Sequence, residues 1–480
     1  MAASGFTRRS LLRYLGGTAL AIPLAGLAVA CGAQPSAPAA TSGTGSNAAP
    51  TAASGGTTSS SAGAAPTAAP KAAASGSTGS SKAIVVWYGK DYLDGTTDTL
   101  KAQMDDFTKK SNVPVDFQVK SGAWTDQLNA SVQAGTAPDI WQSYDYQCQY
   151  WNAQGQALEL SQVINKYKDK NGGFFPYILP TISAQGKIFA APLATNTWPI
   201  HARQDILDKE NGGKFPDTWD TQREIGKKIT NAPKLYAYGW TMGKTNDTNN
   251  HFIGTLWTFG GKLQNEDGSF GLKANDDAAL AVLDLAQKMY ATDKMLPEAV
   301  VQWDDGGNNN SYQEEQTAWT SNPLSVYGWC LQNKPDLAKN TSFYNYPKGP
   351  AGSFGQVDVW GLTVWKKTPQ QENVLQAIDW WIDPAHHADR IKTLAPRFTP
   401  IYQDLLNDQV WDKPLFAGIK DIAKTGRIMA YAASPQAGYS TFTTRFLIGE
   451  MMQNVIVKKT SPKDAYNQFY QAAKNAYEQY

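Results

Sequence analysis

The body of this 480-residue chain is predicted to adopt an α/β fold. Runs rich in β-branched or aromatic residues begin at Ile84, Val113 and Pro138, with turn residues beside them. Between these runs, residues 98–110 and 124–134 place apolar side chains at helical spacing. Strands and helices that alternate in this order form a parallel sheet with helices packed on it.

Each of these elements follows from its own residue pattern. Residues 84–88 form a short apolar run that is followed directly by a glycine. Leu100, Met104 and Phe107 recur on one face of the helix that comes next. Residues 113–119 then alternate apolar and polar side chains, which is typical of a half-buried strand.

The rest of the body repeats this mixture of helices and short apolar runs. Further helices are predicted at 221–229, 276–290, 370–382 and 462–480. In the third of these, Trp380 and Trp381 are adjacent, so we expect one ring inside the core and the other partly exposed. We find no internal repeat and no heptad pattern.

Composition separates the first 82 residues from this body. They contain five Lys or Arg and no acidic residue, so the 38 remaining cations face 42 anions in the body. All 16 Trp also lie beyond residue 82. A mildly acidic body argues against nucleic acid as a partner, because that function favours a basic patch. About 400 residues are enough for two or more domains.

The chain begins with an export signal. Arg8 and Arg9 form a twin-arginine pattern, and an apolar run follows from residue 14 to 30, so residues 1–30 are predicted to be a signal peptide. The run ends at Cys31 in a pattern that resembles the lipobox of bacterial lipoproteins. We therefore expect an exported protein, held on the outer face of the cell membrane by lipidation of Cys31. An ordinary signal that leaves Cys31 unmodified is the alternative.

Residues 31–82 are predicted to be a lipidated cysteine followed by a disordered linker. In 32–82, 47 of the 51 residues are Ala, Gly, Ser, Thr or Pro, and no large apolar residue can offset the entropy of folding. Such a linker would let a folded body move above the membrane while it stays anchored. The other two cysteines, Cys148 and Cys330, could pair, but free and buried thiols are favoured.

A series of motifs in the body resembles family 1 extracellular solute-binding proteins, the maltose-binding-like group. The motifs begin at Asn112 (NVPVDF), Ala134 (AGTAPDI), Gly155 (GQALEL), Gly186 (GKIFAAPL), Pro216 (PDTW), Leu256 (LWTFGGKL), Trp303 (WDDGGNNN), Gly328 (GW), Pro347 (PKGP) and Trp360 (WGLTV). The resemblance covers residues 83–480, and its strength lies in the order of many short matches.

The resemblance implies a two-lobed, type II periplasmic-binding-protein-like fold that closes on its ligand like a hinged trap. We expect lobe one at 83–193 and 350–392, and lobe two at 194–349 and 393–480. It also implies a monomeric binding component that delivers a solute, expected to be a carbohydrate, to the permease subunits of an ABC importer. No cofactor or metal is implied, and the membrane would be touched only through the lipid anchor.

Candidate ligand contacts are aromatic rings, which suit the C–H faces of a sugar, and polar groups, which suit its hydroxyls. Some follow predicted strands, where parallel sheets bind their ligands; for others, above all the rings of Trp329 and Trp360, the family resemblance is the guide. The full set is Tyr88, Asp91, Tyr144, Asp145, Asn196, Trp198, Trp240, Asn250, Trp303, Asp304, Trp329, Trp360 and Arg397. Solvated turns, helix caps, core tryptophans and an ordinary ion pair of Arg397 are the alternatives.

A secreted glycoside hydrolase is the main rival function, because it would also combine aromatic rings with carboxylates. That chemistry needs two carboxylates at a set separation, which a sequence does not show. The four His show no HExxH spacing and no GxSxG motif occurs in the body, so metalloprotease and α/β-hydrolase chemistry is not indicated. A binding protein for a non-sugar solute, such as a polyamine or a peptide, is the other alternative. We predict that the protein is not an enzyme.

Overall fold

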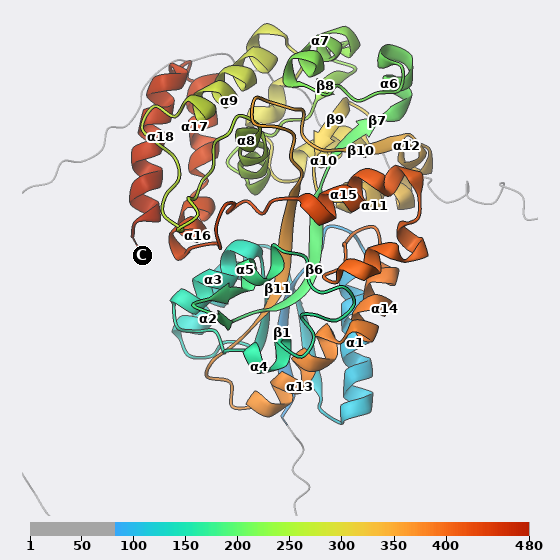
Figure 1. The fold of residues 1–480 in the computed structure, drawn as a ribbon, viewed down its shortest axis with the longest axis vertical. Helices are drawn as coiled ribbons and strands as arrows, with labels where there is room; N and C mark the ends of the chain where they lie inside the picture. The colour runs from blue at the N-terminus through green and yellow to red at the C-terminus, as the bar shows by residue number, and fades with distance from the viewer. Residues whose placement is uncertain (1–81, 480) are drawn as a thin grey trace, which may run out of the picture. The chain divides into compact units, whose positions relative to one another are not determined.

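Two β-sheets organise the computed structural model, which describes residues 82–479 (Figure 1). The predicted signal peptide, Cys31 and the linker up to residue 81 lie outside these residues. One sheet has five strands in the order β2-β1-β3-β11-β6, and the other has four in the order β10-β7-β9-β8. Both sheets are flanked by helices, so the α/β prediction is confirmed.

The five-stranded sheet contains the strands predicted first. Its members are β1 (Ile84–Gly89), β2 (Val115–Lys120), β3 (Ile140–Ser143), β6 (Ala191–Trp198) and β11 (Gln356–Val364). β1 pairs in parallel with β2 and β3, as the alternation of strands and helices predicted. β11 enters between β3 and β6 and runs antiparallel to both, which makes the sheet mixed. The sequence analysis did not foresee this insertion.

Helices cover both faces of this sheet. They are α1 (Thr96–Ser111), α2 (Trp124–Gln133), α3 (Asp145–Ala153), α4 (Ser161–Ile164), α5 (Ile178–Ile182), α13 (Gln371–Ile382) and α14 (Pro384–Leu394). α1 buries Leu100, Met104 and Phe107, and ends where Asn112 adopts the left-handed conformation common after helices. In α13, Trp381 is fully buried and Trp380 is half-buried, as predicted from their adjacent positions.

The four-stranded sheet consists of β7 (Ile200–Arg203), β8 (Tyr236–Tyr238), β9 (Thr317–Ser321) and β10 (Thr341–Tyr344). Around it lie α6 (Gln204–Asn211), α7 (Trp219–Ile229), α8 (Asn246–Thr258), α9 (Asp277–Gln287), α10 (Gly307–Gln313), α11 (Ser325–Asn333), α12 (Pro335–Lys339), α15 (Ala417–Thr425), α17 (Leu447–Ile456) and α18 (Pro462–Tyr477). Local signals begin several of these helices. Thr218 caps α7 and Ser461 caps α18, each by accepting a backbone N–H three residues ahead.

Two strands carry the chain between the sheets. β6 ends at Trp198 in the first sheet, and β7 of the second sheet begins two residues later. β11 returns the chain to the first sheet, with Gln356 opposite Trp198 in the ladder. Figure 1 shows β6 and β11 side by side along the path from one sheet to the other. The predicted lobe boundary at 193/194 falls inside β6; the exact lobe limits remain a prediction.

A helix near the C-terminus connects the helices around the five-stranded sheet with those around the four-stranded sheet. The helix α16 (Ala437–Thr444) packs against α3 of the first region and against α18 of the second. Cys148 and Cys330 are free and buried, as favoured from the sequence. Across residues 82–479, none of the helices has both the length and the apolar character needed to span a bilayer.

Candidate ligand-binding site

The antiparallel register of β11 brings several polar side chains together near the start of α3. Gly361 lies opposite Ser143 of β3, and Asp358 lies opposite Asn196 of β6. The chain leaves β3 at Ser143 and begins α3 at Asp145, whose pKa is raised in part by the charge of Asp358. We call the side chains gathered here the crossover cluster; they come from the β1–α1 and β3–α3 turns, from β6 and β11, and from the segment that follows α14.

Arg397 is the positive centre of the crossover cluster. Its Nε and Nη2 donate to the two carboxylate oxygens of Asp91 at 2.9 and 2.7 Å, and its Nη1 donates to Asn196 Oδ1 at 2.6 Å. The guanidinium also lies 4.9 Å from the ring centre of Trp360 and 4.2 Å from that of Phe398. Arg397 and Asp91 are both buried, so the ion pair left open by the sequence is formed here in full.

Aromatic rings lie beside this ion pair. The ring of Tyr144 meets that of Trp360 edge-on at 5.2 Å and stacks with Tyr146 at 5.9 Å. Trp198 is buried and donates its indole N–H to Asp358 Oδ2 at 2.8 Å. These aromatic rings therefore lie in the same region as the carboxylates of the crossover cluster. The indole N–H of Trp198 is oriented by its hydrogen bond to Asp358.

The two carboxyl groups of the cluster that do not bond Arg397, those of Asp145 and Asp358, have raised pKa values. Burial raises the pKa of Asp145 to about 8, and the negative charge of Asp358 adds to the shift. Burial likewise raises the pKa of Asp358 to about 6, although the hydrogen bond from Trp198 lowers it in part. Within residues 82–479 neither group forms a salt bridge, although the charge of Arg397 lowers the pKa of Asp358 in part.

Several buried polar atoms of this region have no hydrogen-bond partner within residues 82–479. They are Asp145 Oδ2, Asp358 Oδ1, Asn196 Nδ2 and the hydroxyl of Tyr439 on α16. Most buried polar groups in proteins are paired, so a group of unpaired atoms at one place requires an explanation. Both acceptors and donors are present, which matches the needs of a ligand rich in hydroxyl or amino groups.

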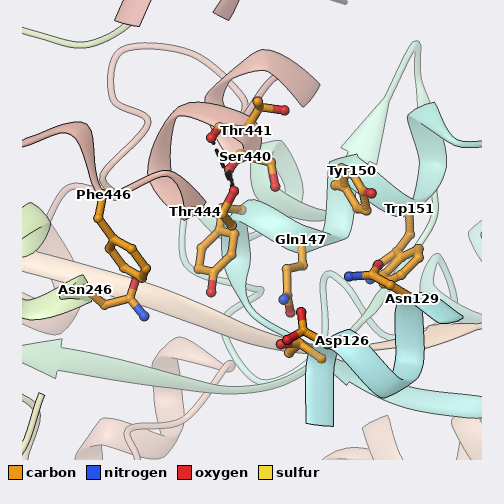
Figure 2. A pocket seen from close by; sticks show the side chains of 12 residues that line it. Asp126, Asn129, Gln147, Tyr150, Trp151, Asn246, Ser440, Thr441, Thr444 and Phe446 are labelled. Atoms are coloured by element: carbon orange, nitrogen blue, oxygen red, sulfur yellow. Dashed lines mark hydrogen bonds between the residues drawn. The ribbon is translucent and has the colours of Figure 1, made fainter. Parts of the chain in front are cut away.

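A cavity of about 460 Å³ lies next to this cluster (Figure 2). One wall comes from α2 and α3, the other from α8, α16 and the turn after α16. The lining residues are Thr125, Asp126, Asn129, Tyr146, Gln147, Tyr150, Trp151, Asn246, Ser440, Thr441, Thr444 and Phe446. Tyr146 lines the cavity, and its ring stacks at 5.9 Å on that of Tyr144, which belongs to the crossover cluster, so the cavity and the cluster adjoin.

Phe446 lines this cavity in a rare backbone conformation. Its φ is +51°, in the left-handed region that bulky residues seldom adopt. Figure 2 shows its ring near Asn246, on the side of the cavity opposite Gln147 and Tyr150. Strained residues of this kind are concentrated at binding sites, where the surrounding structure holds them.

The sequence of residues 93–388, more than half of the chain, matches the family model for bacterial extracellular solute-binding proteins. The chain belongs to this family. Among curated proteins, a probable ABC transporter-binding protein of Deinococcus radiodurans is 22% identical over 402 residues, which cover 80% of this chain and 91% of that protein.

Solved structures of solute-binding proteins share the fold. A solute-binding protein of Thermotoga lettingae bound with α-D-tagatose has a TM-score of 0.72 and 18% identity, covering 83% of this chain and all of that one. A sugar transporter protein of Arthrobacter chlorophenolicus with bound laminaribiose has a TM-score of 0.69 and 18% identity, covering 82% and 99%. The two-lobed fold expected from the sequence is therefore shown.

Within this solute-binding protein, six of the residues predicted as ligand contacts meet in the crossover cluster. They are Asp91, Tyr144, Asp145, Asn196, Trp360 and Arg397, joined by Trp198 through Asp358. Tyr88 lies close by but is fully buried, with its ring stacked on Phe117 at 5.9 Å. Their role as ligand contacts remains a prediction, whereas their convergence is a finding.

The residues predicted in the second lobe are more scattered. Trp240 is fully buried and stacks with Trp219 at 6.2 Å, so its ring belongs to the core of this structure. Asn250 is also buried; its side chain donates to Asn246 O at 2.9 Å and accepts a hydrogen bond from Gln356 of β11. Asn250 thus ties α8 to the start of a crossing strand.

The three other residues predicted in this lobe do not line the cavity of Figure 2. Trp303 is half-buried and fills the space beside Gly307. Asp304 is exposed and accepts the backbone N–H of Gly306 at 2.9 Å, in the turn before α10, a helix that has no side-chain cap. Trp329 is half-buried on α11.

Sequence reasoning missed Asp358, Tyr439 and Phe446. Asp358 had a usable signal, because a charged residue is uncommon inside an apolar run such as Val357–Val364. Tyr146 ends segment 142–146, which follows the third predicted strand and was expected at the site as a whole. Tyr439 and Phe446 carried no local signal, since only the packing of α16 on α3 brings their segment to the site.

Proposed function

We propose that this protein binds a saccharide or a related polyol between its two lobes and delivers it to an ABC importer. The cavity that adjoins the crossover cluster carries this proposal, because its two walls combine aromatic rings with hydroxyl and amide groups. Flat rings complement sugar faces, and the polar groups complement sugar hydroxyls. The sugars bound by the related solved structures support the same ligand class.

Binding would work by closure of the lobes about the crossing strands. Contacts already bridge the two regions: the Tyr92 hydroxyl donates to Gln313 Oε1 at 3.1 Å, and α3 packs against α16. A ligand that touches both walls interacts more strongly with the closed form, and this difference is what shifts the equilibrium. The protein holds its ligand and breaks no bond in it.

Export, anchoring and partners complete the proposal. The twin-arginine signal would direct the chain across the membrane, and acylation of Cys31 would hold it at the outer surface as a monomer. The permease subunits of the importer would receive the ligand there. The relationship to the probable ABC transporter-binding protein of Deinococcus radiodurans supports this assignment.

Thermal-shift measurement against a panel of mono- and oligosaccharides and sugar alcohols tests the proposal. A ligand that binds the native state raises the melting temperature in a concentration-dependent way. Small-angle scattering with the best ligand should then show a smaller radius of gyration. A panel without any stabilising saccharide, or binding without compaction, would refute the proposed function.

A secreted glycoside hydrolase is the second candidate, and one observation favours it. Asp145 and Asp358 are carboxyl groups with different raised pKa values, as an acid and base pair has, and the charge of Asp358 adds to the shift of Asp145. Family membership argues against it. Release of reducing sugar from polysaccharides by the purified protein, abolished by Asp358→Asn, would establish hydrolysis and displace the binding role.

A further inference from the structure

The loop between β1 and α1 touches the helices around the four-stranded sheet. The Tyr92 hydroxyl donates to Gln313 Oε1 of α10 at 3.1 Å, and Leu93 lies against Gly328 of α11. In the view of Figure 1, α1 and α11 lie on one side of β6 and β11, whereas α3 and α16 lie on the other. The loop therefore joins the two lobes at a place separate from the packing of α3 on α16. We call residues 91–93 the latch segment.

Gly328 allows Leu93 to approach α11 closely. A Cβ atom at residue 328 would lie 2.8 Å from Leu93 Cδ2, 3.7 Å from Cδ1 and 3.8 Å from Cγ. The first of these distances is shorter than a normal carbon–carbon contact of about 3.5–4.0 Å. Apart from the backbone of α11 and the adjacent residues, these are the three nearest atoms, so an added methyl group would meet Leu93 first. The backbone of Gly328 is helical, so the helix itself would accept alanine there.

Asp91 holds the latch segment in place. Its Oδ1 accepts the backbone N–H of Leu93 at 2.9 Å, an Asx turn that folds the segment back on itself. Its two carboxylate oxygens also accept hydrogen bonds from Arg397, whose Nη1 donates to Asn196 of β6. Asp91, Arg397 and Asn196 are all buried. A continuous series of hydrogen bonds thus links a crossing strand to Leu93 and fixes where that side chain meets α11.

We propose that the latch segment holds the two lobes closed, and that Gly328 is the residue that lets them close fully. This inference rests on the proposed closure of the lobes about a ligand and adds the residues that determine how far they close. Opening would separate Leu93 from Gly328 and Tyr92 from Gln313, because each pair joins elements of different lobes. Contacts made only in the closed form are those that bias such an equilibrium.

A disulfide tests the position of the latch segment without any ligand. Leu93→Cys and Gly328→Cys in one full-length chain should form a disulfide in oxidised glutathione. Leu93 Cγ lies 3.8 Å from the Cβ position of residue 328, and disulfide-linked Cβ atoms lie about 3.5–4.5 Å apart. Peptide mapping by mass spectrometry identifies the linked pair. The control combines Leu93→Cys with Val457→Cys, a position that is 55% exposed after α17, and should stay reduced.

Small-angle scattering of the linked chain then measures closure. Its radius of gyration should be smaller than that of the same chain after reduction, because the reduced lobes are free to open. A 93–328 disulfide that does not form, or that forms no faster than the control pair, would overturn the inference. Equal radii before and after reduction would also overturn it, since the contact would then be a permanent part of the fold.

Affinity measurements test Gly328 in ligand binding. Gly328→Ala should weaken the binding of maltose or laminaribiose about ten-fold, through faster dissociation, because the added methyl group keeps the lobes from closing fully. The melting temperature of the ligand-free chain should not change. Leu93→Ala in the same chain should recover part of the affinity, because it removes the side chain that the methyl group meets. Calorimetry gives the affinities, and stopped-flow fluorescence gives the dissociation rates.

The outcomes separate this inference from the proposed function. Unchanged affinity in Gly328→Ala, or a loss that Leu93→Ala does not reduce, would overturn the inference and leave saccharide binding standing. A chain that binds no saccharide, yet forms the 93–328 disulfide and becomes more compact with it, would refute the proposed ligand class and support the latch segment.

Discussion

Two carboxyl environments at the crossing strands differ in one respect. Asp91 is buried and fully paired with Arg397, whereas Asp145 is buried as deeply and has one oxygen without a partner. A buried charge pair that is complete can serve the fold alone. A buried carboxyl group left incomplete destabilises the fold, and such groups are retained at functional sites. The contrast separates a structural ion pair from a candidate ligand contact.

The largest expected effect on stability comes from breaking the ion pair between Arg397 and Asp91. Arg397→Met leaves Asp91 buried without its cation, so the free energy of unfolding should fall by about 3–5 kcal/mol. Urea denaturation measures this change. Adding Asp91→Asn to the same chain should recover part of the loss, because the uncompensated charge is removed. A loss below about 1 kcal/mol for Arg397→Met would mean that the pair is not decisive for folding.

Replacing the incompletely paired carboxyl group of Asp145 should instead raise the stability of the folded protein. The folded protein keeps the proton of Asp145 up to about pH 8, whereas the unfolded chain releases it near pH 3.8. Between these values the folded state binds more protons, so stability without ligand falls as the pH rises. Asp145→Asn removes this dependence and should raise stability at pH 8 by about 2–3 kcal/mol.

Urea denaturation of both chains at pH 5 and pH 8 measures this second effect. The wild-type protein should lose stability between the two pH values, and the variant should lose less. Equal pH dependence in the two chains would show that Asp145 is compensated in the folded state, which removes the contrast with Asp91.

A third test concerns the strained side of the cavity. Phe446→Gly removes the ring and also relieves the left-handed backbone, which a glycine adopts readily. Stability should rise by about 1 kcal/mol, while affinity for the saccharide ligand should fall about ten-fold. Calorimetry and thermal melting give the two quantities. A loss of stability without a loss of affinity would assign Phe446 to the fold.

The smallest effect is expected at a contact outside both carboxyl environments. Tyr92→Phe removes the hydroxyl that bonds Gln313 across the lobes, in a side chain that is 43% exposed. Because an exposed hydrogen bond contributes about 0.5 kcal/mol, the low end of the range for hydrogen bonds, ligand affinity should fall by only about two-fold. A larger loss would show that closure depends on this bridge more than on the buried carboxyl groups.

Local sequence pattern predicted correctly which side chains a single helix buries. The helical spacing of Leu100, Met104 and Phe107 places exactly that face of α1 in the core, and adjacent Trp380 and Trp381 divide as expected. The family resemblance predicted the overall two-lobed fold. It also pointed to Asp91 and Arg397, although not to the pair that they form with each other.

Local pattern was a poor guide wherever distant segments meet. Trp240 was expected to contact the ligand, yet its ring is fully buried, and Phe446, which was not expected there, lines the cavity of Figure 2. The position of Phe446 depends on the packing of α16 against α3, two helices almost 300 residues apart. No spacing within either helix records that contact.

The amino-acid sequence by itself determined the first three strands and their parallel order, the main helices, and the acidic, aromatic-rich character of the body. These properties depend on local propensity and on periodicity, both of which are set by residues close together in the sequence. Tertiary structure alone decided which carboxyl group is paired and which is left free. The insertion of β11 between β3 and β6 contributes to that choice, because it sets Asp358 opposite Asn196, while Arg397 pairs with Asp91.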